Sequence, residues 1–392
     1  MSPPQGGSAP ADPFAAAQLG PVTLRNRIIK AATFEGMTPK HVVSSRLIEF
    51  HREVARGGVG MTTVAYCAVS PDGCGTPNEI VLTEETVPGL ARLAEAVHAE
   101  GAAVSAQLGH AGAVAAATGH RGLAPSRIFS PLALRFARPV DDGDIARITA
   151  DFAAAARLLA DAGFDAVELH LGHGYLLSEF LSPGLNRRTD AWGGSLENRS
   201  RFPRQVASAV REAVGSSLAV LAKLNMADGV RGGLWLDESL QVARFLEADG
   251  TLDALELTAG SSLQNPMYLF RGEAPIDEMA AMFPQPMRLG FRLLGGRFLR
   301  TYPFEEAYLL PYARQFRAAL HMPLVLLGGI NRRETIERAM GEGFEFVAMG
   351  RALLREPDLV RRLQAGEAAE GLCIHCNKCM PTIYRGTHCV LV

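Results

Sequence analysis

Short apolar runs alternate with amphipathic segments along most of the chain. Each apolar run has four to six residues, which is typical of a buried strand. Their regular spacing, with a helical segment between neighbours, indicates parallel strands joined by crossovers. We expect strands at Arg27–Ala32, Gly60–Ala65, Ala103–Leu108, Ala166–Leu171, Ala219–Leu224, Ala254–Thr258, Leu324–Gly328 and Phe346–Met349.

The segments between these runs repeat apolar residues with a helical period. Asp144 and Asp237 would begin two of the helices and are suited to N-caps. Eight strands that alternate with helices predict an α/β fold, a closed (β/α)8 TIM barrel. We expect helices at Ser45–Arg56, Val87–Glu100, Asp144–Asp161, Glu197–Val214, Asp237–Asp249, Arg332–Gly341 and Glu356–Ala365.

Three segments fall outside the alternation. Residues 1–13 are rich in Pro, Gly, Ala and Ser and predict a disordered lead-in, not a signal peptide, before a barrel at 14–366. Residues 261–317, after the sixth strand, are too long for a crossover and interleave aromatic residues with arginine. Four interpretations of this segment remain open: a lid, a subunit contact, an insertion with its own core, and a membrane-surface segment. Residues 367–392 form a Cys-rich C-terminal extension.

Composition narrows the class of protein. With 392 residues, 48% of them hydrophobic, the chain can bury a large core. A formal net charge of -2 offers no basic field for nucleic acid. No apolar run approaches the ~20 residues of a membrane span. We therefore expect a soluble cytoplasmic protein that acts on small molecules, and a homo-oligomer is compatible with this composition.

Two histidines and a tyrosine follow the fourth predicted strand. His170, His173 and Tyr175 lie at its carboxyl end, the usual place for the site of a barrel enzyme. Imidazoles can hydrogen-bond an oxygen that gains charge, and a phenol can deliver a proton. A metal-binding pair and ordinary loop histidines are the alternatives for this HxxH spacing.

Other residues predict a bound phosphate and a buried cation. Gly328-Gly329 and Gly350-Arg351 follow strands seven and eight, where backbone N–H groups can approach a phosphate. No GxGxxG follows a strand, so no Rossmann site is indicated. Lys223 lies within the fifth apolar strand and needs a negative partner. An ion pair or a Schiff-base role are both open for it.

Four cysteines crowd the end of the chain. Cys373, Cys376 and Cys379 are separated by two residues each, and Cys389 follows after nine more. Thiolates at this spacing suit a [4Fe–4S] cluster or zinc, and free thiols are the third alternative.

The segment Val167-Glu-Leu-His-Leu-Gly-His-Gly-Tyr175, with Asn186-Arg-Arg-Thr-Asp-Ala-Trp-Gly-Gly-Ser-Leu-Glu-Asn-Arg199 after it, resembles the Old Yellow Enzyme family of FMN-dependent ene-reductases. The resemblance covers roughly residues 12–389. It implies that His170 and His173 bind the substrate oxygen and that Tyr175 protonates the alkene carbon. It also implies that NAD(P)H reduces the flavin, leaves, and is replaced by the oxidant. The residues it places against FMN are Ala31, Ala32, Thr33, Ala65, Gln107, Lys223, Gly328, Gly329, Gly350 and Arg351.

Two details of this resemblance stay open. The family often carries a hydroxyl or thiol that tunes the flavin after the first strand, and either Thr33 supplies it or Phe34 takes its place. Gln107 suits the pyrimidine edge of a flavin because an amide both donates and accepts, but it could also cap a strand.

The cysteine segment resembles the dienoyl-CoA reductase and trimethylamine dehydrogenase branch, in which such cysteines hold a [4Fe–4S] cluster. That branch often adds a second nucleotide-binding region. We expect none here, since the sequence ends at Val392. The leading hypothesis is an FMN enzyme that reduces activated C=C bonds of α,β-unsaturated carbonyl or nitro compounds with NAD(P)H. A Schiff-base lyase using Lys223 and an iron–sulfur electron-transfer module are the alternatives.

Overall fold

The computed structural model describes residues 11–115, 121–130, 135–262 and 264–392, so most of the predicted lead-in lies outside the described residues. Its central element is a closed parallel barrel in which each strand pairs with the next and the last pairs with the first. The predicted barrel and its eight strands are confirmed. They are β3 (Ile28–Lys30), β4 (Met61–Ala68), β6 (Ala103–Gly109), β11 (Ala166–Leu171), β12 (Ala219–Asn225), β13 (Ala254–Thr258), β14 (Leu324–Leu326) and β15 (Phe346–Met349).

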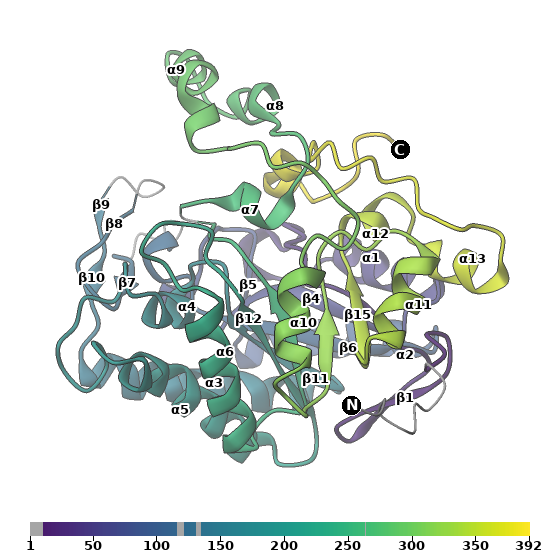
Figure 1. Ribbon diagram of the computed structural model, residues 1–392, viewed down its shortest axis with the longest axis horizontal. Coiled ribbons are helices and arrows are strands. Elements are labelled where there is room, and N and C mark those ends of the chain that lie inside the picture. The colour runs from purple at the N-terminus through teal and green to yellow at the C-terminus, as the bar shows by residue number, and fades with distance from the viewer. Residues whose placement is uncertain (1–10, 116–120, 131–134, 263) are drawn as a thin grey trace, which may run out of the picture.

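Helices surround the barrel at the predicted places (Figure 1). Two predicted N-caps are wrong. Asp141 caps α3 and forms a capping box with Asp144, and Trp235 precedes α6, so Asp237 lies in its first turn. The outer helices are α1 (Ser45–Arg56), α2 (Val87–His98), α3 (Asp142–Asp161), α5 (Leu196–Val214), α6 (Leu236–Asp249), α10 (Leu310–Arg317), α11 (Arg333–Gly341), α12 (Arg351–Arg355) and α13 (Leu359–Ala365).

The last predicted helix begins later than expected. Glu356 does not start a helix but lies between α12 and α13, where its buried carboxylate accepts hydrogen bonds from Arg362 and from the backbone of Leu372. A proline at position 357 disfavours helical backbone at the residue before it, which explains the break.

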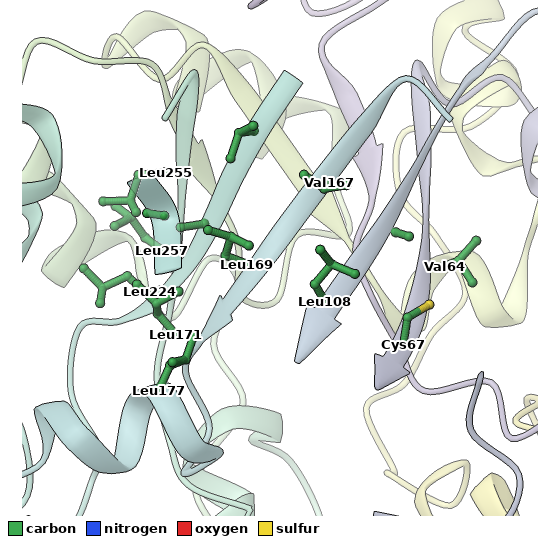
Figure 2. Packing of buried hydrophobic residues seen from close by; sticks show 14 of the residues in the cluster. Val64, Cys67, Leu108, Val167, Leu169, Leu171, Leu177, Leu224, Leu255 and Leu257 are labelled. Atoms are coloured by element: carbon green, nitrogen blue, oxygen red, sulfur yellow. The ribbon is translucent and has the colours of Figure 1, made fainter. Parts of the chain in front are cut away.

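Residues along each strand alternate between two buried environments. On β11, Val167, Leu169 and Leu171 pack in the layer between barrel and helices, together with leucines of β12 and β13 (Figure 2). The intervening Glu168 and His170 are buried as well and belong to the other face of the strand. This alternation sends polar side chains of several strands into the barrel interior.

A short hairpin covers the N-terminal end of the barrel. β1 (Ala17–Leu19) pairs antiparallel with β2 (Val22–Leu24), and both leucines are fully buried. They belong to one apolar cluster with the first residues of the strands, such as Ala166, Ala219 and Phe346. The opposite, carboxyl end of the strands therefore holds the open part of the barrel.

The long segment after β13 divides into two parts. α7 (Pro266–Phe270) lies over the barrel, whereas α8 (Ile276–Ala280) and α9 (Met287–Leu294) stand off it (Figure 1). None of the α9 residues is buried, and Leu293 is 75% exposed. α10 returns to the barrel and packs against α6 and β14, so the outlying part ends before Leu310.

Short elements complete the chain. Among the described residues, no helix is both long and apolar enough to cross a bilayer. The remaining strands and the helix after β11 are β5 (Ile80–Val81), β7 (Leu123–Ala124), β8 (Phe129–Ser130), β9 (Arg135–Phe136), β10 (Arg138–Pro139) and α4 (Leu176–Leu181).

Candidate functional site

The predicted histidine–tyrosine cluster forms at the carboxyl end of β11. His170 lies on the strand, and His173 and Tyr175 lie in the turn before α4. The ring centre of His170 is 4.9 Å from that of His173 and 4.8 Å from that of Tyr175. The structure therefore brings all three side chains together, with His173 and Tyr175 only partly buried and open to a ligand.

Hydrogen bonds fix the tautomer of both imidazoles. The backbone N–H of Gly172 donates to Nδ1 of His170, so the proton of that ring is on Nε2. This Nε2–H faces Nδ1 of His173 at 3.2 Å, and Nε2 of His173 in turn lies 2.8 Å from the Thr258 hydroxyl. Both Nε2 atoms therefore carry donors, and Thr258 orients the second ring.

The turn that carries His173 is held in a strained conformation. His173 has a φ of 61°, in the left-handed region that non-glycine residues rarely adopt. Its N–H donates to Oδ1 of Asn225, and its carbonyl accepts from the backbone of Ser262. Because β12 and the start of the long segment both hold this turn, its geometry belongs to the folded barrel and not to the loop alone.

The pKa values of the cluster suit hydrogen-bond and proton donation. Burial and then the Lys223 ammonium lower the pKa of His173 to about 3. Burial, His173 and Lys223 lower the pKa of His170 well below its usual range. Burial and the Glu79 carboxylate raise the pKa of Tyr175 to about 12. At neutral pH the imidazoles are therefore uncharged and the phenol keeps its proton.

A cavity that opens to solvent lies at the barrel mouth beside this cluster. We call it the barrel-mouth cavity. Eight of the ten residues predicted to bind the cofactor line it, together with His173 from the cluster. Two side chains of α7 and Tyr308 also line it, so part of the long segment contributes to the cavity wall. The eight are Ala31, Ala32, Thr33, Lys223, Gly328, Gly329, Gly350 and Arg351.

The other two predicted cofactor residues lie behind the cavity wall. Ala65 is buried, and its N–H donates to the Glu35 carboxylate. The Gln107 amide donates to Glu168 at 2.6 Å. At the end of the first strand, Thr33 lines the cavity and Phe34 packs instead against the cluster around Ala65.

Lys223 has the negative partners that its burial requires. Its Nζ lies 2.8 Å from Glu168 and 3.0 Å from Glu256. Burial disfavours the ammonium, but the two carboxylates outweigh it and raise the pKa of Lys223. Burial and the neighbouring Glu168 raise the pKa of Glu256. A Schiff-base lysine must lose its proton, so this environment does not favour the lyase alternative.

The four C-terminal cysteines line a second, smaller cavity, the cysteine cavity. All four are free thiols, partly exposed. Burial raises the pKa of Cys379 to about 11. Within the described ranges, no three His, Cys, Asp or Glu side chains are placed to hold a metal ion. The segment brings the four thiols to one cavity, and whether they hold a [4Fe–4S] cluster, zinc or no metal stays a prediction.

Several residues that shape the site were not predicted from the sequence. Glu168 lies two positions before His170 on β11, and Glu256 lies two positions before Thr258 on β13. Because every second residue of a strand faces the same side, this spacing was the available signal. Glu35 pairs with buried Lys30 at 2.9 Å, and no local pattern indicates this contact.

The sequence matches the NADH:flavin oxidoreductase / NADH oxidase family over residues 13–259. It is 58% identical to a 4,4'-dithiodibutanoate disulfide reductase of Rhodococcus erythropolis over 96% of this chain and 94% of the relative. It is 34% identical to a metal reductase of Desulforamulus reducens over 95% of this chain and 52% of the relative.

Among solved structures, 2-naphthoyl-CoA reductase is similar, with a TM-score of 0.77 and 26% identity over 90% of this chain and 52% of that chain. The chain therefore spans about half the length of this protein and of the Desulforamulus reducens relative, whereas it spans nearly all of the Rhodococcus erythropolis relative.

Proposed function

We propose that this chain, which belongs to the NADH:flavin oxidoreductase / NADH oxidase family, reduces an activated C=C bond of a small molecule with NAD(P)H at the barrel-mouth cavity. The family is one of FMN enzymes, and FMN is the cofactor of this chain. The observation that carries the proposal is a neutral imidazole, His170, packed between a second neutral imidazole and a protonated phenol beside that cavity.

The residues of the cavity fit FMN. The buried Thr33 hydroxyl has no hydrogen-bond partner and lines the cavity, as a group awaiting a ligand would. Lys223 lies on one side, suited to a flavin ring that gains negative charge. Gly328 and Gly329 have φ values of 111° and 74°, and their loop, with Arg351, suits a phosphate. When bound, FMN would accept a hydride from NAD(P)H and give it to the acceptor.

His170 and His173 would hold the oxygen of the acceptor. Each ring carries its proton on Nε2, so two N–H donors are available without a change of charge. A carbonyl or nitro oxygen that gains negative charge would compete with the internal acceptors of these protons, His173 Nδ1 and Thr258. Donors fixed before the reaction stabilise such charge at little reorganisation cost.

Tyr175 would deliver the proton that completes alkene reduction. The reaction consumes one NAD(P)H, one proton and one C=C bond, and yields NAD(P)⁺ and a C–H bond on each carbon. The phenol is the acid nearest to His170, and its pKa of about 12 keeps it protonated until charge develops on the substrate.

A disulfide is the second candidate acceptor. The relative from Rhodococcus erythropolis that shares 58% of its residues with this chain is named for reduction of 4,4'-dithiodibutanoate. One NAD(P)H, one proton and one disulfide would give NAD(P)⁺ and two thiols. The imidazole N–H groups would then face the sulfur that leaves as thiolate, which needs no proton from Tyr175 to depart.

Stopped-flow measurements separate the candidates. Protein reduced anaerobically with NADH or NADPH is mixed with cyclohexenone or with 4,4'-dithiodibutanoate, and the return of the oxidised flavin absorbance is followed. Fast return with cyclohexenone supports alkene reduction. Return of the absorbance only with the disulfide would support disulfide reduction in place of alkene reduction. A colourless purified protein would contradict both candidates.

A further inference from the structure

Two arginines meet at one end of the barrel-mouth cavity. Arg351 lines the cavity at the start of α12, and Arg271 follows α7 in the long segment. Nη1 of Arg351 donates to the backbone carbonyl of Arg271 at 3.1 Å. The fold thus brings two arginines that are distant in the sequence into direct contact beside the glycine loops.

The Arg271 guanidinium lies among aromatic rings next to the cavity. Its central carbon is 5.1 Å from the ring centre of Tyr308, and 5.4 and 5.9 Å from those of Tyr268 and Tyr302. Tyr308 lines the cavity, and a Cβ added at Gly329 would come within 2.7 Å of its ring. Arg271 is therefore one ring away from the loop that suits a phosphate.

Neither arginine has an anionic partner in the described ranges. No carboxylate forms an ion pair with Arg271 or Arg351 there, and the buried Nε of Arg271 has no hydrogen-bond partner. Two other partly buried arginines are paired with carboxylates, Arg211 with Asp253 and Arg317 with Glu345. Within the described part of the chain, both guanidiniums therefore lack a neighbouring negative charge, and an anion within reach of both would be attracted to this place.

A third segment fixes both arginines. The side chain of Asn377, buried to 1% exposure, accepts from the Arg351 guanidinium and donates to the carbonyl of Arg271 at 3.0 Å. Arg271 itself has a φ of 40°, outside the range that non-glycine residues prefer. An arginine held in such a conformation by contacts to two other segments is placed by the fold, not by its own loop.

We propose that Arg271 is a second ligand of the FMN phosphate, which the long segment supplies opposite Arg351. This inference rests on the proposed function, because it requires FMN in the barrel-mouth cavity. A phosphate dianion within reach of both guanidiniums would satisfy the Arg271 Nε and supply the negative charge that both lack. Flavin binding would then also hold α7 against the cavity, so this helix and the cofactor would stabilise each other.

The test compares FMN with riboflavin, which lacks the phosphate. The full-length protein is freed of flavin and titrated with each compound, and quenching of flavin fluorescence gives the dissociation constants. Arg271→Met keeps the stem among the tyrosines but removes the charge. It should weaken FMN binding about 10- to 100-fold and change riboflavin binding by less than about twofold. Arg271→Lys should recover part of the FMN affinity.

A control variant and the possible outcomes decide whether Arg271 binds the phosphate. Arg300→Ala removes an exposed arginine of the same segment and should leave both constants unchanged. Equal weakening of FMN and riboflavin in Arg271→Met and Arg271→Lys would overturn the inference, because it would mean a role in packing. Unchanged FMN affinity would overturn it too. A wild-type protein that binds neither flavin would instead contradict the proposed function itself.

Discussion

The barrel-mouth cavity and the cysteine cavity adjoin each other and share Arg351 and His375, yet they are built differently. Around the first, buried ion pairs and hydrogen bonds fix polar side chains before any ligand is present, as for Lys223 between two carboxylates. Around the second, four partly exposed thiols face a space without metal-binding geometry among the described residues.

The difference follows from the elements that supply the residues. Strands of a closed barrel hold a side chain from both sides, so an inward charge must be paired within the wall. A C-terminal extension touches the barrel on one side only, and its thiols can take their final positions when a ligand binds. We therefore expect substitutions at the barrel mouth to affect chemistry and stability strongly, and those in the cysteine segment to affect them weakly.

The largest effect should come from Tyr175→Phe. Without the proton donor, reoxidation of the reduced enzyme by cyclohexenone should slow by about 10² to 10⁴-fold. Flavin reduction by NAD(P)H needs no proton from this residue and should be unchanged, as should reoxidation by a disulfide. Stopped-flow absorbance measures each half-reaction. Tyr66→Phe removes the neighbouring phenol, 5.2 Å away between ring centres, and is the matched control. Normal enone turnover in Tyr175→Phe would remove this residue from the mechanism.

Lys223→Met tests the buried ion pairs. Removing the ammonium leaves Glu168 and Glu256 buried without a cation, which should lower the free energy of unfolding by about 3–5 kcal/mol. Urea denaturation followed by circular dichroism measures it. Lys378→Met is the counterpart in the cysteine segment, where Lys378 pairs with Glu278 at the surface. We expect little change there, and equal losses in the two variants would contradict the comparison.

Thr258→Val should have an intermediate effect. The valine has the same shape but gives the Nε2–H of His173 no acceptor, so the ring loses its fixed orientation. We expect kcat/KM for the acceptor to fall about tenfold and KM to rise. Nitrogen-15 NMR of the imidazoles should show a mixture of tautomers. Thr258→Ser restores the hydroxyl and should restore both readings, whereas a purely structural role would not require it.

Cys376→Ala should have the smallest effect at the barrel mouth. Flavin content and both half-reactions should stay within about twofold of the wild type, because the thiol lies outside the barrel wall. Iron and zinc measured in the wild-type protein and in this variant test the cysteine cavity directly. Metal present in the first and lost in the second indicates a bound cluster or ion. Four titratable thiols and no metal in the wild type would indicate free cysteines.

Local patterns were sufficient for much of this architecture. The eight strands and the site at the end of β11 follow from periodicity and from residue types at strand ends. A negative partner for Lys223 was expected, but the sequence did not identify Glu168 and Glu256. Which residues form a buried ion pair depends on which strands become neighbours. The contact between Arg271, Arg351 and Asn377 joins three segments of the chain, of which the first and the last lie more than 80 residues apart. No local sequence pattern indicates this contact.

The hairpin of β1 and β2 packs on the amino-terminal end of the barrel, whereas the His170–Tyr175 cluster lies at the carboxyl end. Donor and acceptor would both bind at this carboxyl end, so we expect them to compete for the same cavity. The two reactants would bind one after the other, and an excess of either would inhibit binding of the other. Steady-state rates should therefore pass through a maximum as NAD(P)H is raised at fixed acceptor, and the maximum should move to higher NAD(P)H as the acceptor is increased.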